Sequence, residues 1–239
     1  TEIYTLSLHD ALPIYSAINS GAFCLLHRDH GMETGWGEPY YTNSSINGLT
    51  NVNNQLPFIF SINCLTGKYN YSSETFAEKF HRYTYSGQNS GALGLIAASE
   101  VSYSFVNDTY LWGMMDNFWP DFMPTYGTTP ASRGFMPCFG NSAGKIYLFS
   151  SSWPYNTNNK TVTYNLFHHH GDAFSVVYSE VPQTLTVNHN NTINAGTTVF
   201  QVSANVGSLI ALSLDDQLLG VATGTGNPVD ITIPGTLVN

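Results

Sequence analysis

The chain has 239 residues, of which 42% are hydrophobic and only 10% charged, and its formal net charge is −9. This length allows one sizeable core, or one domain followed by a smaller one. Seven Lys and Arg residues are too few for the basic patches that nucleic acids and anionic membrane surfaces require, which excludes both partners. No apolar run approaches the roughly 18 residues that a membrane-spanning helix needs.

The first fourteen residues, 1–14, are similar to a translated sequencing adapter, and we interpret them as adapter-derived. His9 and Asp10 are therefore kept out of any catalytic argument. We expect the natural protein to continue upstream of Tyr15, so that the chain is a fragment.

Residues 15–180 have the pattern of an α/β domain. Short apolar runs bounded by turn residues predict buried strands of a parallel sheet at 22–26, 56–62 and 91–99. Helical spacing predicts helices at 76–83, 110–118 and 139–151, the first capped from 72–75 and the second with Trp112, Met115, Phe118 and Trp119 on its apolar side. Residues 33–54 are predicted to be a polar loop with a weak helical pattern at 45–49, and 161–174 closes the unit.

The pattern changes at about Glu180. From there to Asn239, short strands alternate with Asn, Gly and Asp-Asp turns, at 185–187, 199–202, 209–214, 218–222 and 229–233. A β-sandwich has about seven strands, so residues 181–239 are predicted to be part of one.

Two chemically capable side chains stand at the ends of predicted strands. Cys64 follows the second strand, and His30 follows the first. Carboxyl ends of neighbouring parallel strands meet at one edge of a sheet. There a Cys64 thiolate could attack a carbonyl while His30 moves the proton, with the Gly31 and Cys64 amides as an oxyanion hole. The residues alone leave the alternative open that Cys64 is a buried structural thiol and His30 a polar cap.

The other cysteines, Cys24 and Cys138, are interpreted as structural. An odd set of three distant cysteines is not a disulfide framework, and no Cys-x-x-Cys pair suggests zinc. The run His168-His169-His170 is not predicted to bind a metal, because adjacent histidines do not converge on one ion from a regular element. The chemistry needs no cofactor, although the Asn-rich loops could hold structural calcium.

The motif His-Gly-x-Glu-Thr-x-Trp at 30–36, followed after 64 − 30 = 34 positions by a strand ending in Asn63-Cys64, resembles the gingipain-like cysteine peptidases, family C25 of the caspase-like clan. The resemblance implies a caspase-like parallel sheet flanked by helices and followed by a truncated immunoglobulin-like β-sandwich. It also implies that His30 and Cys64 form the catalytic dyad of a secreted or cell-surface endopeptidase that hydrolyses peptides through an acyl-enzyme.

The sequence departs from the family pattern at Asn63, where the clan commonly has Ala or Cys, and at Ser104, which stands at or near a tryptophan that shapes the family's primary specificity pocket. The acidic residue that orients the histidine is expected upstream of Tyr15. Because of Ser104, the sequence does not predict strict specificity for Arg or Lys, and because of the missing acidic residue it does not predict that the fragment alone is active.

Five residues are candidates for the substrate pocket: Glu33, Trp36, Glu100, Ser104 and Asp108. Glu100 or Asp108 would pair with a basic substrate residue, but each can equally be a solvated loop carboxylate. For Glu33 and Trp36, a role in shaping the loop is favoured over substrate contact. Two other functions stay open: a non-catalytic surface module that uses the same scaffold for binding or adhesion, and a carbohydrate-binding module suggested by the many Tyr and Trp residues.

Overall fold

The computed structural model describes residues 11–126, 128–152, 157–180 and 183–233, and the chain divides into two compact units between Glu180 and Val181. This division coincides with the change of sequence pattern at about Glu180. Most of residues 1–14 lie outside the described residues. Ile14, however, is buried in the core of the first unit.

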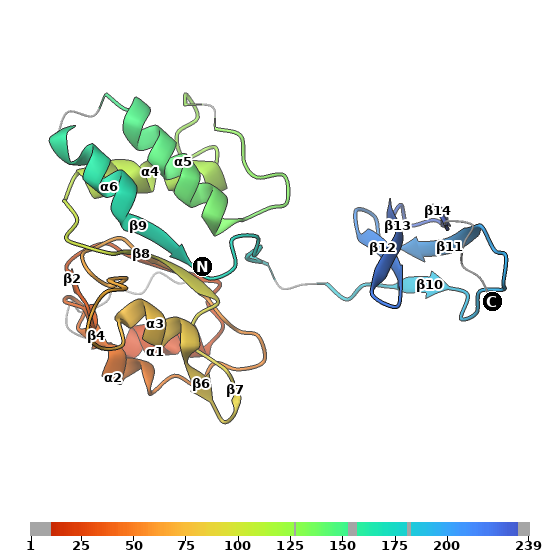
Figure 1. Ribbon diagram of the computed structural model, residues 1–239, viewed down its shortest axis with the longest axis horizontal. Helices are drawn as coiled ribbons and strands as arrows, with labels where there is room; N and C mark the ends of the chain where they lie inside the picture. The colour runs from red at the N-terminus through yellow and green to blue at the C-terminus, as the bar shows by residue number, and fades with distance from the viewer. Residues whose placement is uncertain (1–10, 127, 153–156, 181–182, 234–239) are drawn as a thin grey trace. The chain divides into compact units, whose positions relative to one another are not determined.

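The first unit is built on a four-stranded sheet in the order β1-β5-β8-β9 (Figure 1). Strands β1 (Cys24–His27), β5 (Phe58–Ser61) and β8 (Gly94–Ala98) are parallel, which confirms the three predicted strands. The sheet is not parallel throughout, however, because β9 (Phe167–His170) pairs antiparallel with β8. This edge strand was missed because three of its four residues are histidines, which do not form an apolar run.

Helices cover both faces of this sheet (Figure 1). One face carries α1 (Leu12–Asn19), α2 (Asn43–Ile46) and α3 (Phe76–Arg82), and the other carries α4 (Val106–Phe118), α5 (Pro137–Ser150) and α6 (Lys160–Leu166), which follows the short 3-10 helix η1 (Thr157–Asn159). Alternate residues of β5 face opposite layers, so Ile59 packs with the first set of helices and Phe60 with the second. Helices on both sides explain why the central strands β5 and β8 are buried at every position, although β5 ends on the polar Ser61.

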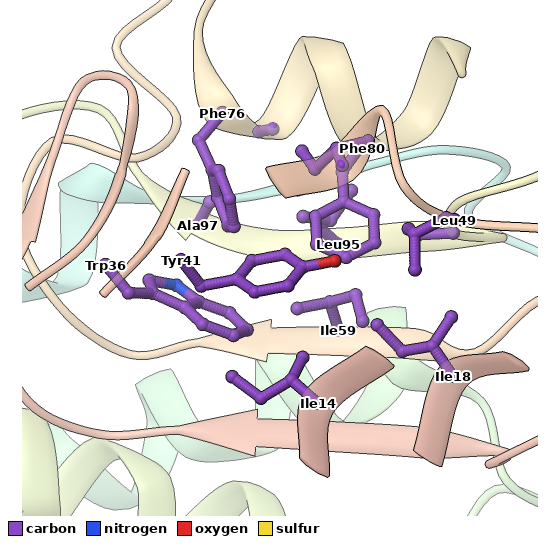
Figure 2. Packing of buried hydrophobic residues seen from close by; sticks show 13 residues of the cluster. Ile14, Ile18, Trp36, Tyr41, Leu49, Ile59, Phe76, Phe80, Leu95 and Ala97 are labelled. Atoms are coloured by element: carbon purple, nitrogen blue, oxygen red, sulfur yellow. The ribbon is translucent and has the colours of Figure 1, made fainter. Parts of the chain in front are cut away.

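The segment predicted as a polar loop, 33–54, is folded instead. It contains the strands β3 (Gly35–Trp36) and β4 (Tyr41–Thr42), which form a small antiparallel sheet with β2 (Gly31–Met32), and then α2. Trp36 and Tyr41 are fully buried against Phe76, as Figure 2 shows. The prediction of a loop was wrong because the two aromatic rings, and not the many polar residues around them, decide the packing.

Helix α3 begins where expected, at the Thr75 cap. The Thr75 hydroxyl accepts from the Glu78 amide and the Glu78 carboxylate accepts from the Thr75 amide, which forms a capping box. Helix α4 begins earlier than predicted, at Val106, and its buried side carries Tyr110 and Met114. The predicted apolar side of α4 is confirmed only in part: Met115 and Phe118 pack partly buried against the core, whereas Trp112 is only partly buried and Trp119 is exposed. A two-stranded hairpin, β6 (Thr84–Tyr85) and β7 (Gln88–Asn89), follows α3.

The second unit contains two small antiparallel sheets. Strands β10 (Val187–His189), β11 (Val199–Ala204) and β14 (Val229–Thr232) form one, and β12 (Leu209–Leu214) and β13 (Gln217–Thr223) form the other. Their core is small, with Phe200, Val202, Ile231 and Ile233 buried. Asp215 and Asp216, both with positive φ, make the tight turn between β12 and β13. Among the described helices of the chain, none is long and apolar enough to cross a membrane.

The antiparallel strand β9 leads to a prediction about acid stability. Burial, and then the neighbouring His168, His169 and His81, lower the pKa of His170 to about 4, against a weaker opposite effect of Glu78. Between about pH 4 and pH 6.5, His170 is therefore protonated in the unfolded chain but neutral in the folded protein. Stability should therefore fall as the pH is lowered from about 6.5 to about 4.

Replacing His170→Gln should make this fall shallower, which urea unfolding at several pH values would measure. His30→Gln is the matched control, because the His30 side chain is 91% exposed. Equal pH dependence of the wild type and His170→Gln would contradict the assignment of the effect to His170.

Candidate active site

The sheet register places the two candidate residues level with each other. Strand β1 ends at His27 and β5 at Ser61, and these two residues are directly paired. His30 and Cys64 each follow three positions later, since 30 − 27 = 64 − 61 = 3. Both side chains therefore belong to loops that leave the same edge of the sheet, at the carboxyl ends of adjacent parallel strands.

These two loops touch each other at Gly31. A Cβ atom at this position would lie 2.5 Å from Asn63 Oδ1 and 2.6 Å from the Cys64 carbonyl oxygen. Only a residue without a side chain permits so close an approach. The glycine after His30 thus sets the distance between the histidine loop and the cysteine loop.

The sulfur of Cys64 faces the loop after β8. Its hydrogen-bond contacts within the described residues are with Ser102: the Ser102 amide donates to Sγ at 3.3 Å, and Sγ lies 3.5 Å from the Ser102 carbonyl oxygen and 3.7 Å from its hydroxyl. The Ser102 hydroxyl accepts from Asn107 Nδ2 at 2.7 Å. The buried Asn107 thus holds the side chain that faces the sulfur.

Two tight turns with left-handed backbone flank the sulfur. The Thr66 amide donates to the Cys64 carbonyl at 2.8 Å around Leu65, whose φ is +64°, and the Val106 amide donates to the Ser104 carbonyl at 2.7 Å around Phe105, whose φ is +65°. Each is a γ-turn with a positive central φ, a strained conformation for a residue with a side chain. Strain of this kind collects at functional sites, where the surrounding structure maintains it.

The His30 ring lies in solvent. Its side chain is 91% exposed, its backbone amide donates to Asp29 Oδ1 at 2.7 Å, and its Nε2 lies 4.0 Å from the same oxygen. Between the described side chains of His30 and Cys64 there is no hydrogen bond. The structure brings the two loops together but not the ring and the sulfur.

The proposed oxyanion groups lie at this contact. Within the described part of the chain, the Cys64 amide has no backbone acceptor, and Gly31 pairs with Trp36 next to the bond from the Gly37 amide to the His30 carbonyl. Cys64 thus offers an unengaged backbone donor beside its own sulfur.

Each acidic pocket candidate lies near a cation of this chain. Asp108 Oδ1 accepts from Arg28 Nε at 2.6 Å. Lys68 Nζ lies 3.3 Å from Glu100 Oε2 and 3.9 Å from Glu33 Oε1. These pairs are partly exposed and worth little to stability. They still lower the negative charge that this edge of the sheet would show to a substrate.

The two uncharged pocket candidates differ in burial. Trp36 is 1% exposed, stacks on the His27 ring and donates from Nε1 to Ser61 Oγ, which fits a role in shaping the loop. Ser104 is exposed in the strained turn, and the next residue, Phe105, presents a half-exposed ring.

Sequence reasoning missed the partners of these loops. These partners are His27, which bonds to Asn63, Ser102, which contacts Cys64, and Arg28, which pairs with Asp108. Each is a single polar residue outside any sequence motif. The departure from the family pattern at Asn63 was the one signal that could have led to His27.

The remaining candidates are the histidine run of β9 and the other two cysteines. His168 donates to or accepts from Ser99, and among the described residues no three His, Cys, Asp or Glu side chains converge as a metal site. Cys24, Cys64 and Cys138 are all free, and burial raises the pKa of Cys24 to about 11. Cys24 is thus protonated at neutral pH and has the character of a structural thiol. The calcium prediction stays without assigned ligands.

An α/β domain with a cysteine and a histidine on adjacent loops at the carboxyl ends of parallel strands has the architecture of a cysteine peptidase. The model of Peptidase family C25 matches residues 6–178, and the chain belongs to this family.

The relatives are gingipains of Porphyromonas gingivalis. Gingipain R2 is 26% identical over 211 residues, which cover 87% of this chain and 27% of that protein. Lys-gingipain HG66 is 26% identical over 238 residues, or 95% of this chain and 13% of that protein. The chain therefore spans about a quarter or less of these relatives.

The crystal structure of the Arg-specific cysteine proteinase gingipain R superposes with a TM-score of 0.76 at 24% identity. The superposition covers 94% of this chain and 50% of that one. It shows that the fold is shared.

The contact at Gly31 leads to a prediction. Gly31→Ala should force the histidine and cysteine loops apart and slow the acylation of Cys64 by a thiol-reactive peptide probe about 100-fold, since displacements of about 1 Å have effects of this size. Gly87→Ala is the control: its φ is +75°, but a Cβ there meets no atom within 4 Å. Mass spectrometry of the labelled protein gives both rates, and a Gly31→Ala rate equal to that of the wild type would refute the prediction.

Proposed function

We propose that the chain is a cysteine endopeptidase in which Cys64 is the nucleophile and His30 the general base and acid. The observation that carries this proposal is the contact of the His30-Gly31 loop with the Asn63-Cys64 loop at the carboxyl edge of β1 and β5. Membership of the C25 family supports it.

The reaction follows from these groups. His30 takes the Cys64 thiol proton, and the sulfur attacks the carbonyl carbon of the scissile peptide to form a C–S bond. The Cys64 and Gly31 amides stabilise the developing oxyanion. His30 then donates the proton to the leaving amine as the C–N bond breaks. Water, deprotonated by His30, hydrolyses the resulting thioester and restores the thiol.

This mechanism requires the His30 ring to turn toward the sulfur when substrate binds. The ring is almost fully exposed, so no packing opposes a change of rotamer. Catalytic hydrogen bonds are often long in free enzymes and shorten in the substrate complex. The proposal therefore includes a change of the His30 side chain on binding, with the backbone contact at Gly31 already formed.

One observation favours the other function, a non-catalytic binding module: the sulfur contacts Ser102 while the ring lies in solvent. In such a module, the exposed aromatic residues Tyr103 and Phe105, on the same loop as Ser102, would contact a partner without acylation.

The wider assignments are part of the same proposal. The location is secreted or at the cell surface, a choice supported by sparse charge and abundant Asn, Ser and Thr. Residues 181–239 form part of an immunoglobulin-like domain, supported by the two antiparallel sheets.

The nucleophile is tested by labelling. A thiol-reactive peptide probe should acylate the wild type and the Cys138→Ala control equally, but not Cys64→Ala, and His30→Ala should slow the reaction by about 10²–10⁴-fold. Labelling of Cys64→Ala at the wild-type rate would exclude Cys64 as the nucleophile. Binding of the peptide without acylation of the wild type would instead support the binding module.

Substrate preference is tested through Arg28. In the wild type, the pairing of Asp108 with Arg28 should favour peptides with a neutral residue before the scissile bond. Arg28→Gln frees the carboxylate and should raise kcat/KM for peptides with Arg at that position about tenfold relative to neutral ones, as expected for one charged hydrogen bond. The double variant Arg28→Gln/Asp108→Asn should lose this gain. An unchanged ratio in Arg28→Gln would show that Asp108 does not contact the substrate.

A further inference from the structure

The amide side chain of Asn63 is buried between the two loops of the candidate site. Asn63 is 1% exposed and His27 is 8% exposed. Asn63 Nδ2 lies 2.8 Å from His27 Nδ1, and His27 Nε2 lies 3.0 Å from the Glu38 carbonyl oxygen. A carbonyl only accepts, so Nε2 carries the ring hydrogen and Nδ1 accepts from the Asn63 amide.

The opposite side of the same amide is also engaged. Asn63 Oδ1 accepts from the Ser61 hydroxyl at 3.1 Å and from the Thr66 hydroxyl at 2.9 Å, and the Ser61 oxygen in turn accepts from Trp36 Nε1 at 2.8 Å. The amide therefore has one orientation that satisfies all these groups, with its nitrogen toward His27 and its oxygen toward the hydroxyls. A buried network of this kind is rigid because any other arrangement leaves a polar atom unpaired.

The His27 ring is suited to remain an acceptor. It stacks on Trp36 with 4.3 Å between the ring centroids and an angle of 5° between the planes. Burial lowers its pKa, while the Glu38 carbonyl and Asp29 raise it and Arg28 lowers it further. The net effect keeps the ring neutral at neutral pH, so that Nδ1 has a lone pair for Asn63.

This network reaches both reacting groups through the backbone. Asn63 directly precedes Cys64, and its Oδ1 is the atom that a Cβ at Gly31 would approach to 2.5 Å, next to His30. Thr66 closes the strained turn after Cys64. The Asn63 side chain thus contacts the loop of His30, belongs to the loop of Cys64, and bonds to Thr66 at the end of the turn that follows Cys64.

We propose that Asn63, held by the neutral His27 ring, is a positioning residue that fixes the Cys64 loop against the His30 loop. The proposal rests on the cysteine peptidase function proposed above and adds to it the residues that set the acylation geometry. Neither side chain touches the substrate in this proposal. Both act through the backbone of the cysteine loop.

Loss of a buried amide destabilises any fold, so a matched control is needed. Asn51 is also 1% exposed, and its Nδ2 donates to the carbonyls of Gln55 and Gly91 at 2.8 and 2.9 Å while its Oδ1 accepts from Ser90 at 2.9 Å. It connects the loops that precede β5 and β8, at the opposite edge of the sheet from Cys64. The Asn51 Oδ1 also accepts from the Gly91 amide at 3.1 Å, so Asn51→Ala removes one hydrogen bond more than Asn63→Ala, at the opposite ends of the same strands.

The experiment uses the full chain, below the unfolding temperature of each variant, with two reagents. A thiol-reactive peptide probe requires the acylation geometry, whereas iodoacetamide requires only an accessible thiol. Asn63→Ala should slow peptide acylation of Cys64 about 10- to 100-fold while changing iodoacetamide alkylation less than about threefold, because only the first reaction depends on orientation. Asn51→Ala should leave both rates unchanged.

A conservative variant adds a readout that a structural role alone would not move. Asn63→Asp keeps the shape but requires a hydrogen on His27 Nδ1, which a neutral ring with its hydrogen on Nε2 lacks. The ratio of the Asn63→Asp rate to the wild-type rate should therefore rise as the pH is lowered from 8 to 6, because the new carboxylate favours the protonated His27 ring, which carries a hydrogen on both nitrogens. In the His27→Gln background, this pH dependence of the ratio should disappear.

The outcomes separate the two proposals. Equal slowing by Asn63→Ala and Asn51→Ala, or a wild-type rate in Asn63→Ala, would overturn the positioning role and leave the peptidase function standing. A wild-type Cys64 that reacts with iodoacetamide but never with the peptide probe would overturn the peptidase function and the positioning role with it.

Discussion

The in-register pairing of three parallel strands is the constraint on which the site depends. Strands β1, β5 and β8 are held level by the pairs Cys24–Phe58 and Phe58–Gly94. Helices cover both faces, so the strands are mostly apolar along their length. Polar side chains appear at the strand ends, at His27 and Ser61, and in the loops beyond them, and the shared register brings the ends of the three strands to one edge. The contact between Gly31 and Cys64 is a consequence of this pairing.

At that edge the backbone departs from relaxed geometry, and the surrounding side chains hold it there. The γ-turns at Leu65 and Phe105 each cost conformational energy. The buried Asn63 and Asn107 amides lie beside these turns: Asn63 bonds to His27 at the end of β1, and Asn107 bonds to Ser102 across the Phe105 turn. Rigid polar contacts of this kind allow strained loops to keep one conformation. The His30 side chain is the element of the site that lies in solvent, as the proposed change of its rotamer on substrate binding requires.

Much of this arrangement is readable from local sequence. The apolar runs predict the three parallel strands, because a short run between turn residues fits a buried strand better than a helix. The Thr75 cap predicts the start of α3, and the positions of His30 and Cys64 just beyond strand ends place them at one edge. These features depend on residues close together in the chain, so their physical basis is visible before folding. For the segment 33–54 the same reasoning gave a wrong prediction, because most of its residues are polar while two aromatic residues, Trp36 and Tyr41, form its core.

The tertiary structure alone decided which polar groups meet. His27 and Asn63 are 36 positions apart, and Arg28 and Asp108 are 80 apart. No periodicity in the sequence pairs them, because a hydrogen bond or ion pair between loops depends on how closely the packed strands bring those loops together. By itself, the sequence determined the strands and the chemical identity of the side chains at their ends. Packing determined that the acidic side chains are paired within the chain, and that the cysteine loop is fixed while the histidine ring stays in solvent.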